Sequence, residues 1–299
     1  MSFNIDKDRL ALISTEKLLI LSSLMFLASV LVGQEPHDLL NQWHTNSVDG
    51  QSYSQCNQWK ITYPDGSSEK DLCYTVDGDD QEYYYVNSAG DGIVFRVPIR
   101  SNNGTTPNSK NVRSELRELK EDGSGRIFWT TQGNHVIYVK QAITHLTMRK
   151  PHIVATQIHG NKEEGIDDSM VLRLDQDHLY LNFNGGKLRD SITIKRGYQL
   201  GTIHEVIFQV IDGKHYCYYS EDGKLKDAFI NRSAGRYLVK DGKDPVLMDL
   251  NYGDVYFKAG NYTQSNKGRE GDATDDPNNY SEVVIYDLVV DHHGDRTPE

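Results

Sequence analysis

Three short segments of the chain carry side chains that can transfer protons or bind an anion. They are residues 111–118 (NVRSELRE), 156–160 (TQIHG) and 255–264 (VYFKAGNYTQ). Each segment alternates polar with apolar residues, and alternate side chains of a β-strand point to the same side. We therefore expect each segment to present its polar residues on one face of a sheet.

The first segment predicts a cationic row. Arg113, Glu115 and Arg117 share one face, and Glu115 can hold the two guanidinium groups in place. The planar fork of an Arg suits a carboxylate. The alternative is a solvated charged face stabilised by ion pairs between strands.

The second segment places Gln157 and His159 on one face and turns Ile158 to the core. An amide can polarise a substrate carboxylate while a His accepts a neighbouring proton. A single His is, however, more often a hydrogen-bonded structural residue.

The third segment combines two tyrosines with a cation and an amide. Tyr256, Lys258, Tyr262 and Gln264 fall on one face, and Gly260 would leave room above the strand for a substrate. The alternative is a Tyr-rich surface strand.

The combined side chains match what elimination from a uronate chain requires. The C5 proton of a uronate lies next to a carboxylate, so the charge that develops there must be stabilised. A base must then remove this proton, and an acid must protonate the leaving oxygen at C4. Arg and Gln suit the first task, and His and Tyr suit the other two.

The rest of the chain reads as short strands that could position these segments. Strands are expected at 93–97, 135–143, 170–174, 179–183, 206–211, 215–219 and 283–290, and Asp212-Gly213 predicts a hairpin turn. No long amphipathic helix is expected between residues 53 and 299. The pattern predicts an all-β fold, an antiparallel two-sheet sandwich or jelly roll, in one catalytic domain.

The motifs RSELR (113–117), QIH (157–159) and YFKAGNYTQ (256–264) resemble, in order, those of the alginate lyases of polysaccharide lyase family 7. The resemblance extends from about Phe95 to the closing strand. It implies a β-jelly roll with a concave substrate cleft, alginate as the acidic polysaccharide partner, and no metal or cofactor.

The resemblance also implies roles for individual residues. Arg113 and Gln157 would neutralise the substrate carboxylate, and His159 would be the base. Tyr262 would be the acid and, for mannuronate, the base as well. The expected substrate-binding or orienting residues are Glu115, Arg117, Tyr256, Lys258 and Gln264. An Ile at position 158 is associated with guluronate-containing blocks.

Two other functions fit parts of the pattern. A non-catalytic carbohydrate-binding sandwich would explain the fold and the aromatic residues, but it would not need His159 and Tyr262 beside the Arg row. A glycoside hydrolase would need paired carboxylates, and the spacing of Glu115 and Glu118 puts them on opposite faces of a strand.

Composition and the N-terminal region set the remaining expectations. The net charge of −11 argues against nucleic acid as a partner, and we expect a monomer. Residues 1–33 contain an apolar run, 18–32, that resembles a secretory signal, although a retained anchor is the alternative. We therefore expect a secreted protein without stable membrane association after signal removal, with a spacer or short leading helix at 34–52 and the catalytic domain at 53–299.

The chain has three cysteines, and their spacing does not suggest a zinc site. A secreted protein could form a Cys56–Cys73 disulfide, and three free thiols are the alternative.

Overall fold

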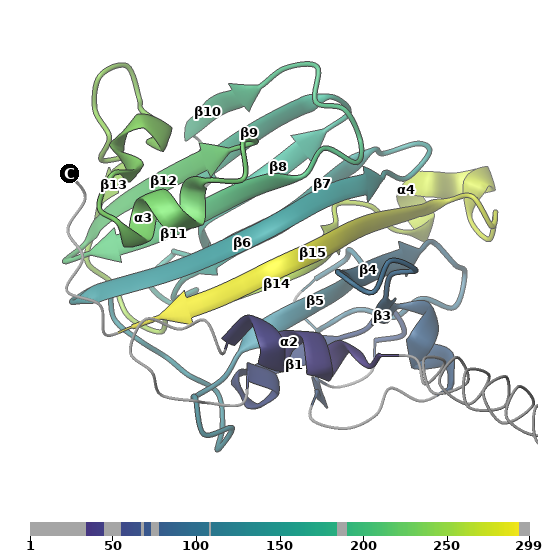
Figure 1. Cartoon of the computed structure of the whole chain (residues 1–299). Helices are drawn as coiled ribbons and strands as arrows, with labels where there is room; N and C mark the ends of the chain where they lie inside the picture. Colours follow the sequence, from purple (N-terminus) through teal and green to yellow (C-terminus); the bar gives the residue numbers. More distant parts are fainter. Residues whose placement is uncertain are drawn as a thin grey trace, which may run out of the picture. The chain divides into compact units, whose positions relative to one another are not determined.

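Two antiparallel β-sheets pack against each other in the computed structural model of the chain (Figure 1). The structure describes residues 34–44, 55–66, 69–72, 78–107, 109–183 and 190–292. The predicted all-β sandwich is confirmed.

The first sheet has eight strands in the order β10-β9-β8-β7-β14-β5-β1-β2. β14, which is late in the sequence, lies between β7 and β5. The strands are β1 (Trp59–Thr62), β2 (Lys70–Asp71), β5 (Arg113–Glu118), β7 (His152–His159), β8 (Asp168–Asp175), β9 (His178–Phe183), β10 (Asp190–Lys195) and β14 (Tyr256–Thr263).

The second sheet has seven strands in the order β13-β12-β11-β6-β15-β4-β3. It is built around two strands of 12 residues each, β6 and β15. The strands are β3 (Tyr84–Val86), β4 (Ile93–Pro98), β6 (Asn134–His145), β11 (His204–Ile211), β12 (Lys214–Ser220), β13 (Met248–Asp249) and β15 (Tyr280–Asp291).

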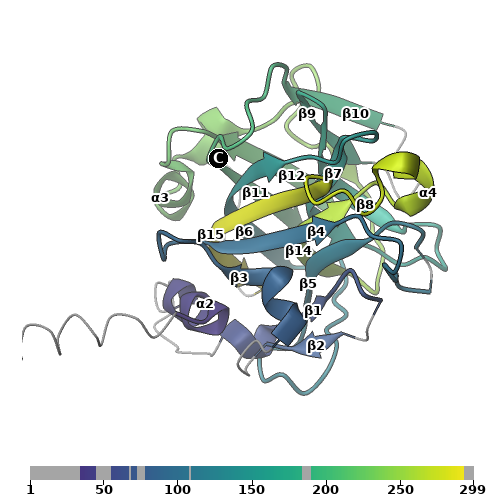
Figure 2. The ribbon, with the colours of Figure 1, turned by 90° about the vertical axis from the view of Figure 1, so that its right-hand side faces the viewer.

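The helices are short and lie outside the sheets. They are α2 (Pro36–His44), η1 (Gln55–Gln58), η2 (Gly78–Glu82), α3 (Leu225–Ile230), η3 (Ala234–Tyr237), α4 (Lys267–Glu270) and η4 (Gly271–Ala273). Leu225 and Ala228 of α3 pack with Tyr138 and Tyr218 on the outer face of the seven-stranded sheet. Figure 2 shows α3 beside that sheet, away from the eight-stranded sheet.

All seven segments that the sequence predicted as strands are strands in the structure. The expected hairpin joins β11 to β12, and both its turn residues have positive φ angles, 47° at Asp212 and 86° at Gly213. Backbone twist in such a turn matches that of the strands it joins. Within the described part of residues 53–299, the longest α-helix is α3, with six residues.

The core between the sheets explains the alternation in the three motif segments. Leu116, Ile158 and Phe257 are fully buried in the same cluster as Ile137 and Val139 of the opposite sheet. Their polar neighbours in the sequence must therefore point to the other side. We call this side of the eight-stranded sheet, facing away from the core, the site face.

The segment at 34–52 contributes to the core where it is described. Helix α2 buries Leu39, Leu40 and Trp43 in the main cluster, so this part of the segment is a packed helix. Residues 1–33, with the predicted signal, lie outside the described residues. In the part of the chain that the structure describes, no helix is long and apolar enough to cross a membrane.

The cysteines divide into two kinds. Cys56 is disulfide-bonded, whereas Cys217 is a free thiol buried in the core. The predicted partner of Cys56, Cys73, lies outside the described residues.

Candidate active site

Strand order brings the three motif segments together. β14 lies between β7 and β5, so residues far apart in the sequence become cross-strand neighbours. Lys258 pairs with Gln157 on one side and with Arg117 on the other. Tyr262 pairs with Arg113, and Tyr256 pairs with His159.

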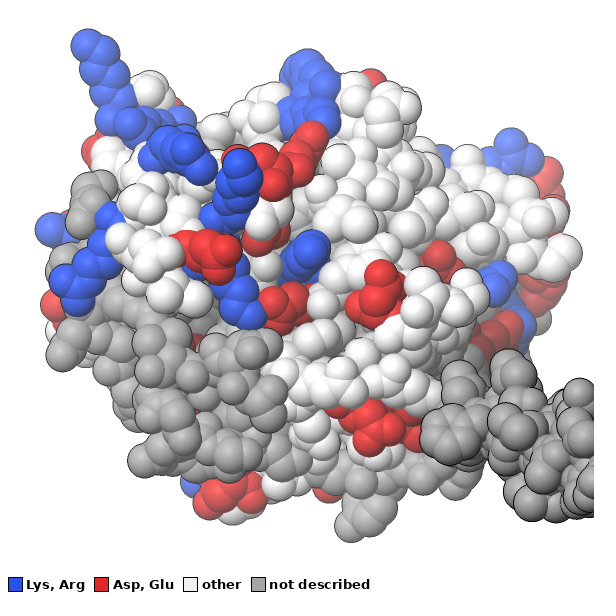
Figure 3. Space-filling view, viewed as in Figure 1, with Lys and Arg blue, Asp and Glu red and all other residues white. Residues whose placement is uncertain are grey.

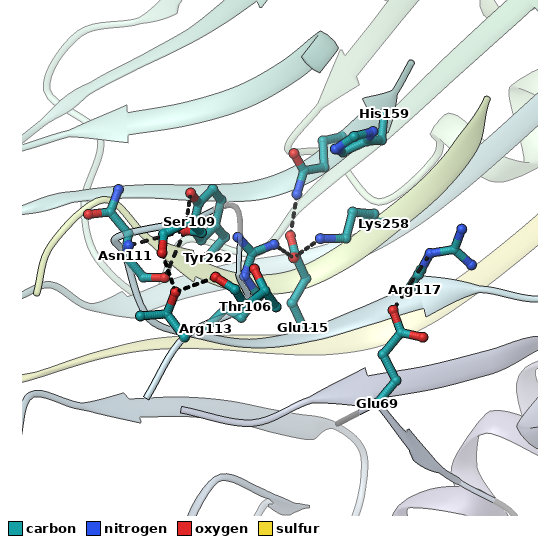
Figure 4. A network of polar contacts seen from close by, with 12 residues as sticks. Glu69, Thr106, Ser109, Asn111, Arg113, Glu115, Arg117, His159, Lys258 and Tyr262 are labelled. Carbon is teal, nitrogen blue, oxygen red and sulfur yellow. Dashed lines mark hydrogen bonds and ion pairs between the residues drawn. The ribbon is translucent and has the colours of Figure 1, made fainter. Parts of the chain in front are cut away.

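Glu115 is the centre of the polar network on the site face (Figure 4). Its carboxylate accepts a hydrogen bond from Arg113 Nη1 at 2.9 Å, and further bonds from Lys258 Nζ and Gln157 Nε2. Glu115 is only 1% exposed. It therefore fixes the positions of two cations and one amide.

Charges within the network shift one another's pKa values. Burial would raise the pKa of Glu115, but the charges of Lys258 and Arg113 outweigh it and hold that pKa below its usual value. Burial, assisted by the charge of Arg113, lowers the pKa of Lys258 to about 8. Two cations thus share the Glu115 carboxylate, and Asp168 is a further acidic group whose charge acts on both cations.

Arg113 keeps donor capacity beyond its bond to Glu115. Its Nε atom is buried and has no hydrogen-bond partner among the described residues. Burial opposes its charge, but Glu115 outweighs this effect and raises the pKa of Arg113. Arg113 is therefore charged and able to bind a further anion.

His159 is suited to accept a proton. Burial, with the charge of Lys258 nearby, lowers its pKa to about 4, so the ring is neutral at neutral pH. Nδ1 lies 3.1 Å from the carbonyl oxygen of Gly160, which can only accept, so we assign the proton to Nδ1. Nε2 then carries the lone pair, and Asp167 Oδ1, 3.3 Å away, can accept its hydrogen once Nε2 has taken up a proton.

Tyr256 holds the imidazole ring in place. Its ring stacks on His159 with centroids 4.6 Å apart and an interplanar angle of 13°. The guanidinium of Arg117 also lies over the Tyr256 ring, 4.0 Å from its centroid. Arg117 further contacts Glu69 at 3.8 Å, so it orients the base through Tyr256.

Tyr262 combines a polar contact with a cation–π contact. Its hydroxyl lies 3.0 Å from Ser109 Oγ, and either group can donate. The guanidinium of Arg113 lies 3.8 Å from its ring centroid. The phenol is thus placed beside the group expected to bind the substrate carboxylate.

Gly260 is required by the backbone of β14. A Cβ at Gly260 would lie 2.9 Å from both Phe95 Cδ1, in the core between the sheets, and the Ser114 carbonyl oxygen. The φ of 125° at Gly260 and the register shift between Ala259 and Tyr262 show that the glycine is needed by a β-bulge.

Gln264 lies apart from the Glu115 network. Its side-chain oxygen accepts from Arg173 at 3.4 Å, and its nitrogen is buried without a hydrogen-bond partner in the described structure. Glu118 is turned away from the site face and accepts from Trp129 Nε1 and the Phe257 amide. A hydrolase pair of Glu115 with Glu118 is therefore excluded by geometry.

Sequence reasoning missed several residues around the site. Asp167 and Ser109 contact the two proton-transfer candidates, but each belongs to a segment without a motif. His159, Asp167 and Asp168 place one ligand atom each within 4.8 Å of one another and could hold a metal ion. The only signal for that group was the Asp167-Asp168 pair that follows the His motif.

The view over the seven-stranded sheet shows a different surface. Most Lys and Arg side chains in this view gather at the upper left, with Asp and Glu among them, and a broad area above and to the right of the centre carries few charges (Figure 3). The buried cationic network is a property of the site face.

Known proteins resemble this chain in sequence and in fold. The alginate lyase family model matches residues 55–292. No curated protein matches the chain. A solved structure of truncated AlyQ, with CBM32 and alginate lyase domains, is 60% identical with a TM-score of 0.78; the alignment covers 88% of this chain and 64% of that one.

Two shorter structures align over nearly their whole length. Alginate lyase AlgAT5 from polysaccharide lyase family 7 is 31% identical, with a TM-score of 0.60 and coverage of 80% of this chain and 95% of that one. An alginate lyase from Corynebacterium sp. is 29% identical, with a TM-score of 0.59 and coverage of 80% and 96%. This chain therefore belongs to the alginate lyases of polysaccharide lyase family 7.

Proposed function

We propose that this protein is a secreted alginate lyase that cleaves the 1,4-glycosidic bonds of alginate by β-elimination. The main support is the buried Arg113–Glu115–Lys258 network beside a neutral His159 and the hydroxyl of Tyr262. This arrangement supplies an anion site, a base and an acid on one sheet face. A binding module would need only the first.

The reaction follows from these positions. Arg113 and Gln157 bind the carboxylate of the reacting uronate, and Lys258 adds positive charge as negative charge develops on that group. His159 Nε2 takes the C5 proton, and the electron pair of the C5–H bond forms the C4=C5 double bond. The C4–O4 bond breaks, and Tyr262 gives its proton to O4. The products are a new chain end and a 4,5-unsaturated uronate end.

For mannuronate, we propose that Tyr262 also serves as the base. The C5 proton of mannuronate lies on the other face of the ring from that of guluronate, away from His159. Because Tyr262 lies beside Arg113, it can approach a bound sugar while the carboxylate remains on the same cation.

The experiment is to incubate the purified protein with alginate and follow the ultraviolet absorbance of unsaturated uronate ends. A lyase gives rising absorbance together with new reducing ends. Reducing ends without absorbance would indicate a hydrolase, and binding without either would indicate a carbohydrate-binding module. Repeating the assay after dialysis against a chelator tests the proposal that the reaction needs no metal.

A further inference from the structure

A second polar cluster lies on the site face beside the Glu115 network. Arg173 on β8 contacts Gln264 Oε1 at 3.4 Å and His152 Nε2 at 3.5 Å. The hydroxyl of Tyr180, on β9, lies 3.4 Å from the same nitrogen of His152. We call Arg173, Gln264, His152 and Tyr180 the β8 cluster.

The β8 cluster has more donors than acceptors. Arg173 Nε and Gln264 Nε2 are both buried, and neither has a hydrogen-bond partner in the described structure. Arg173 as a residue is only 9% exposed. A buried donor without a partner is unfavourable unless a ligand or water accepts its hydrogen bond. The two unpaired donors of the cluster can therefore bind an acceptor group from a ligand.

His152 cannot be that acceptor for both unpaired donors. Its pKa is lowered to about 4 by burial, with the charge of Arg173 as the next cause, so the ring is neutral. Its Nε2 lone pair already faces Arg173 Nη1 and the Tyr180 hydroxyl. The missing acceptor must come from outside the cluster.

The charges around the β8 cluster favour an anion. Arg173, Lys150 and Arg269 act on His152 as cations, and Asp175 is the opposing carboxylate. Asp168 also interacts with Arg173, so these three cations outnumber the two carboxylates that act on the cluster. A planar carboxylate fits the fork of Arg173 and the amide of Gln264 together.

The register places the cluster next to the reacting position. Arg173 pairs with Val154 on β7, and Val154 pairs with Tyr262 on β14. Adjacent strands are about 4.8 Å apart, so the backbone of Arg173 lies about 10 Å across the sheet from that of Tyr262. Gln264 follows Tyr262 by two residues and turns toward Arg173.

We propose that the β8 cluster is a second carboxylate-binding subsite, which holds the uronate next to the one being cleaved. This inference rests on the proposed lyase function and extends it to a residue outside the three motifs. Arg173 would bind ground state and transition state alike, so its loss should raise KM more than it lowers kcat.

The test is Arg173→Gln, which keeps a polar side chain but removes the charge and the fork. Initial rates are measured on purified alginate oligosaccharides of increasing length and on the polymer. We expect kcat/KM on the polymer to fall about ten- to hundredfold, the size of a lost charged hydrogen bond, mainly through KM. The loss should grow with chain length, because the shortest cleaved substrate gains least from a second subsite.

Arg236→Gln is the matched control. Arg236 lies in η3, beside the seven-stranded sheet, with its side chain 64% exposed, and this change alters net charge equally. We expect wild-type KM for this variant at every chain length.

Several results would overturn the inference while leaving the lyase function intact. They are an unchanged KM in folded Arg173→Gln, a loss that is equal at all lengths, or a loss confined to kcat. An inactive wild type would instead refute the proposed function itself.

Gln264→Glu provides a second variant in case Arg173→Gln does not fold. The new carboxylate would pair with Arg173 and occupy the place proposed for the substrate. We expect KM on the polymer to rise at least as much as in Arg173→Gln, and an unchanged KM would again refute the subsite.

Discussion

His159 and Tyr262 lie on either side of the carboxylate-binding network, and the proposed chemistry assigns each one proton transfer. His159 pairs with Tyr256, near one end of β14, and Tyr262 pairs with Arg113, near the other. Glu115 fixes the cations between them. At the scale of single residues, the site therefore separates binding from proton transfer.

We predict that His159→Ala and Tyr262→Phe each lower kcat by about a hundredfold or more, since each removes a general acid–base group. Rates on alginate and far-ultraviolet circular dichroism measure activity and fold. His145→Ala and Tyr237→Phe, on the seven-stranded sheet side, are the controls and should keep activity. Near-normal turnover of either site variant would remove that residue from the mechanism.

Asp167 should influence the pH below which activity is lost, because it acts on the pKa of His159. Its charge raises the pKa of His159, against the larger lowering by burial. Asp167→Asn should therefore lower that pKa further and move the acidic limb of kcat/KM to lower pH. The pH profile is the readout, and a limb that stays in place or moves to higher pH would contradict the assignment.

At the scale of elements, β14 depends on one backbone position. Gly260 adopts a φ of 125° within the bulge, where a Cβ would meet Phe95 and Ser114. We predict that Gly260→Ala lowers the melting temperature by several degrees, because such strain costs about 1–3 kcal/mol. Gly125→Ala is the control, since a Cβ at Gly125 meets nothing within 4 Å. Equal melting temperatures for both variants would show that β14 relaxes without cost.

Strand β7 is where we expect block preference to be set. Ile158 is fully buried and points into the core, whereas Gln157 and His159 lie on the site face. We propose a preference for guluronate-containing blocks. Ile158→Val would remove one methylene beneath the strand and shift His159 relative to C5, which is worth about 1–3 kcal/mol of discrimination.

The measurement compares initial rates on polyguluronate, polymannuronate and alternating blocks for wild type and Ile158→Val. We expect the wild type to favour guluronate and the variant to favour it less. A wild type that prefers polymannuronate would refute the preference, and an unchanged ratio in the variant would refute its cause.

At the scale of the whole molecule, buried neutral histidines should make the fold sensitive to acid. Burial lowers the pKa of His204 and of His215 to about 4, while an unfolded His titrates near 6.5. A lowered His pKa gives stability that is present above the unfolded value and is lost as pH falls towards the folded value. The loss is on the order of 3 kcal/mol for each residue.

Urea unfolding between pH 7 and pH 4.5 tests this expectation. The free energy of unfolding should fall with pH, and His204→Gln should make the fall shallower. His292 acts in the opposite sense, because Glu118 outweighs burial and raises the pKa of His292, so its contribution is lost as pH rises. Stability that is constant or greater at pH 4.5 would contradict the dominance of His204 and His215.

The sequence by itself determined the strands and the faces of the three motifs. Alternation in a strand has a period of two, so Arg113, Glu115 and Arg117 could be assigned to one face without knowing the neighbouring strands. The Asp212-Gly213 turn was equally local, because positive φ depends on the residue type. Such features need only the chain within a few residues.

Only the tertiary structure decided which faces meet. Strand order puts β14 between β5 and β7, and that order makes Glu115 the common acceptor for Arg113, Lys258 and Gln157. The bulge at Gly260, the contact of Asp167 with His159 and the unsatisfied donors of Arg173 and Gln264 likewise depend on neighbours distant in the sequence. Periodicity specifies a direction for each side chain, but partners and burial arise when separate strands pack together.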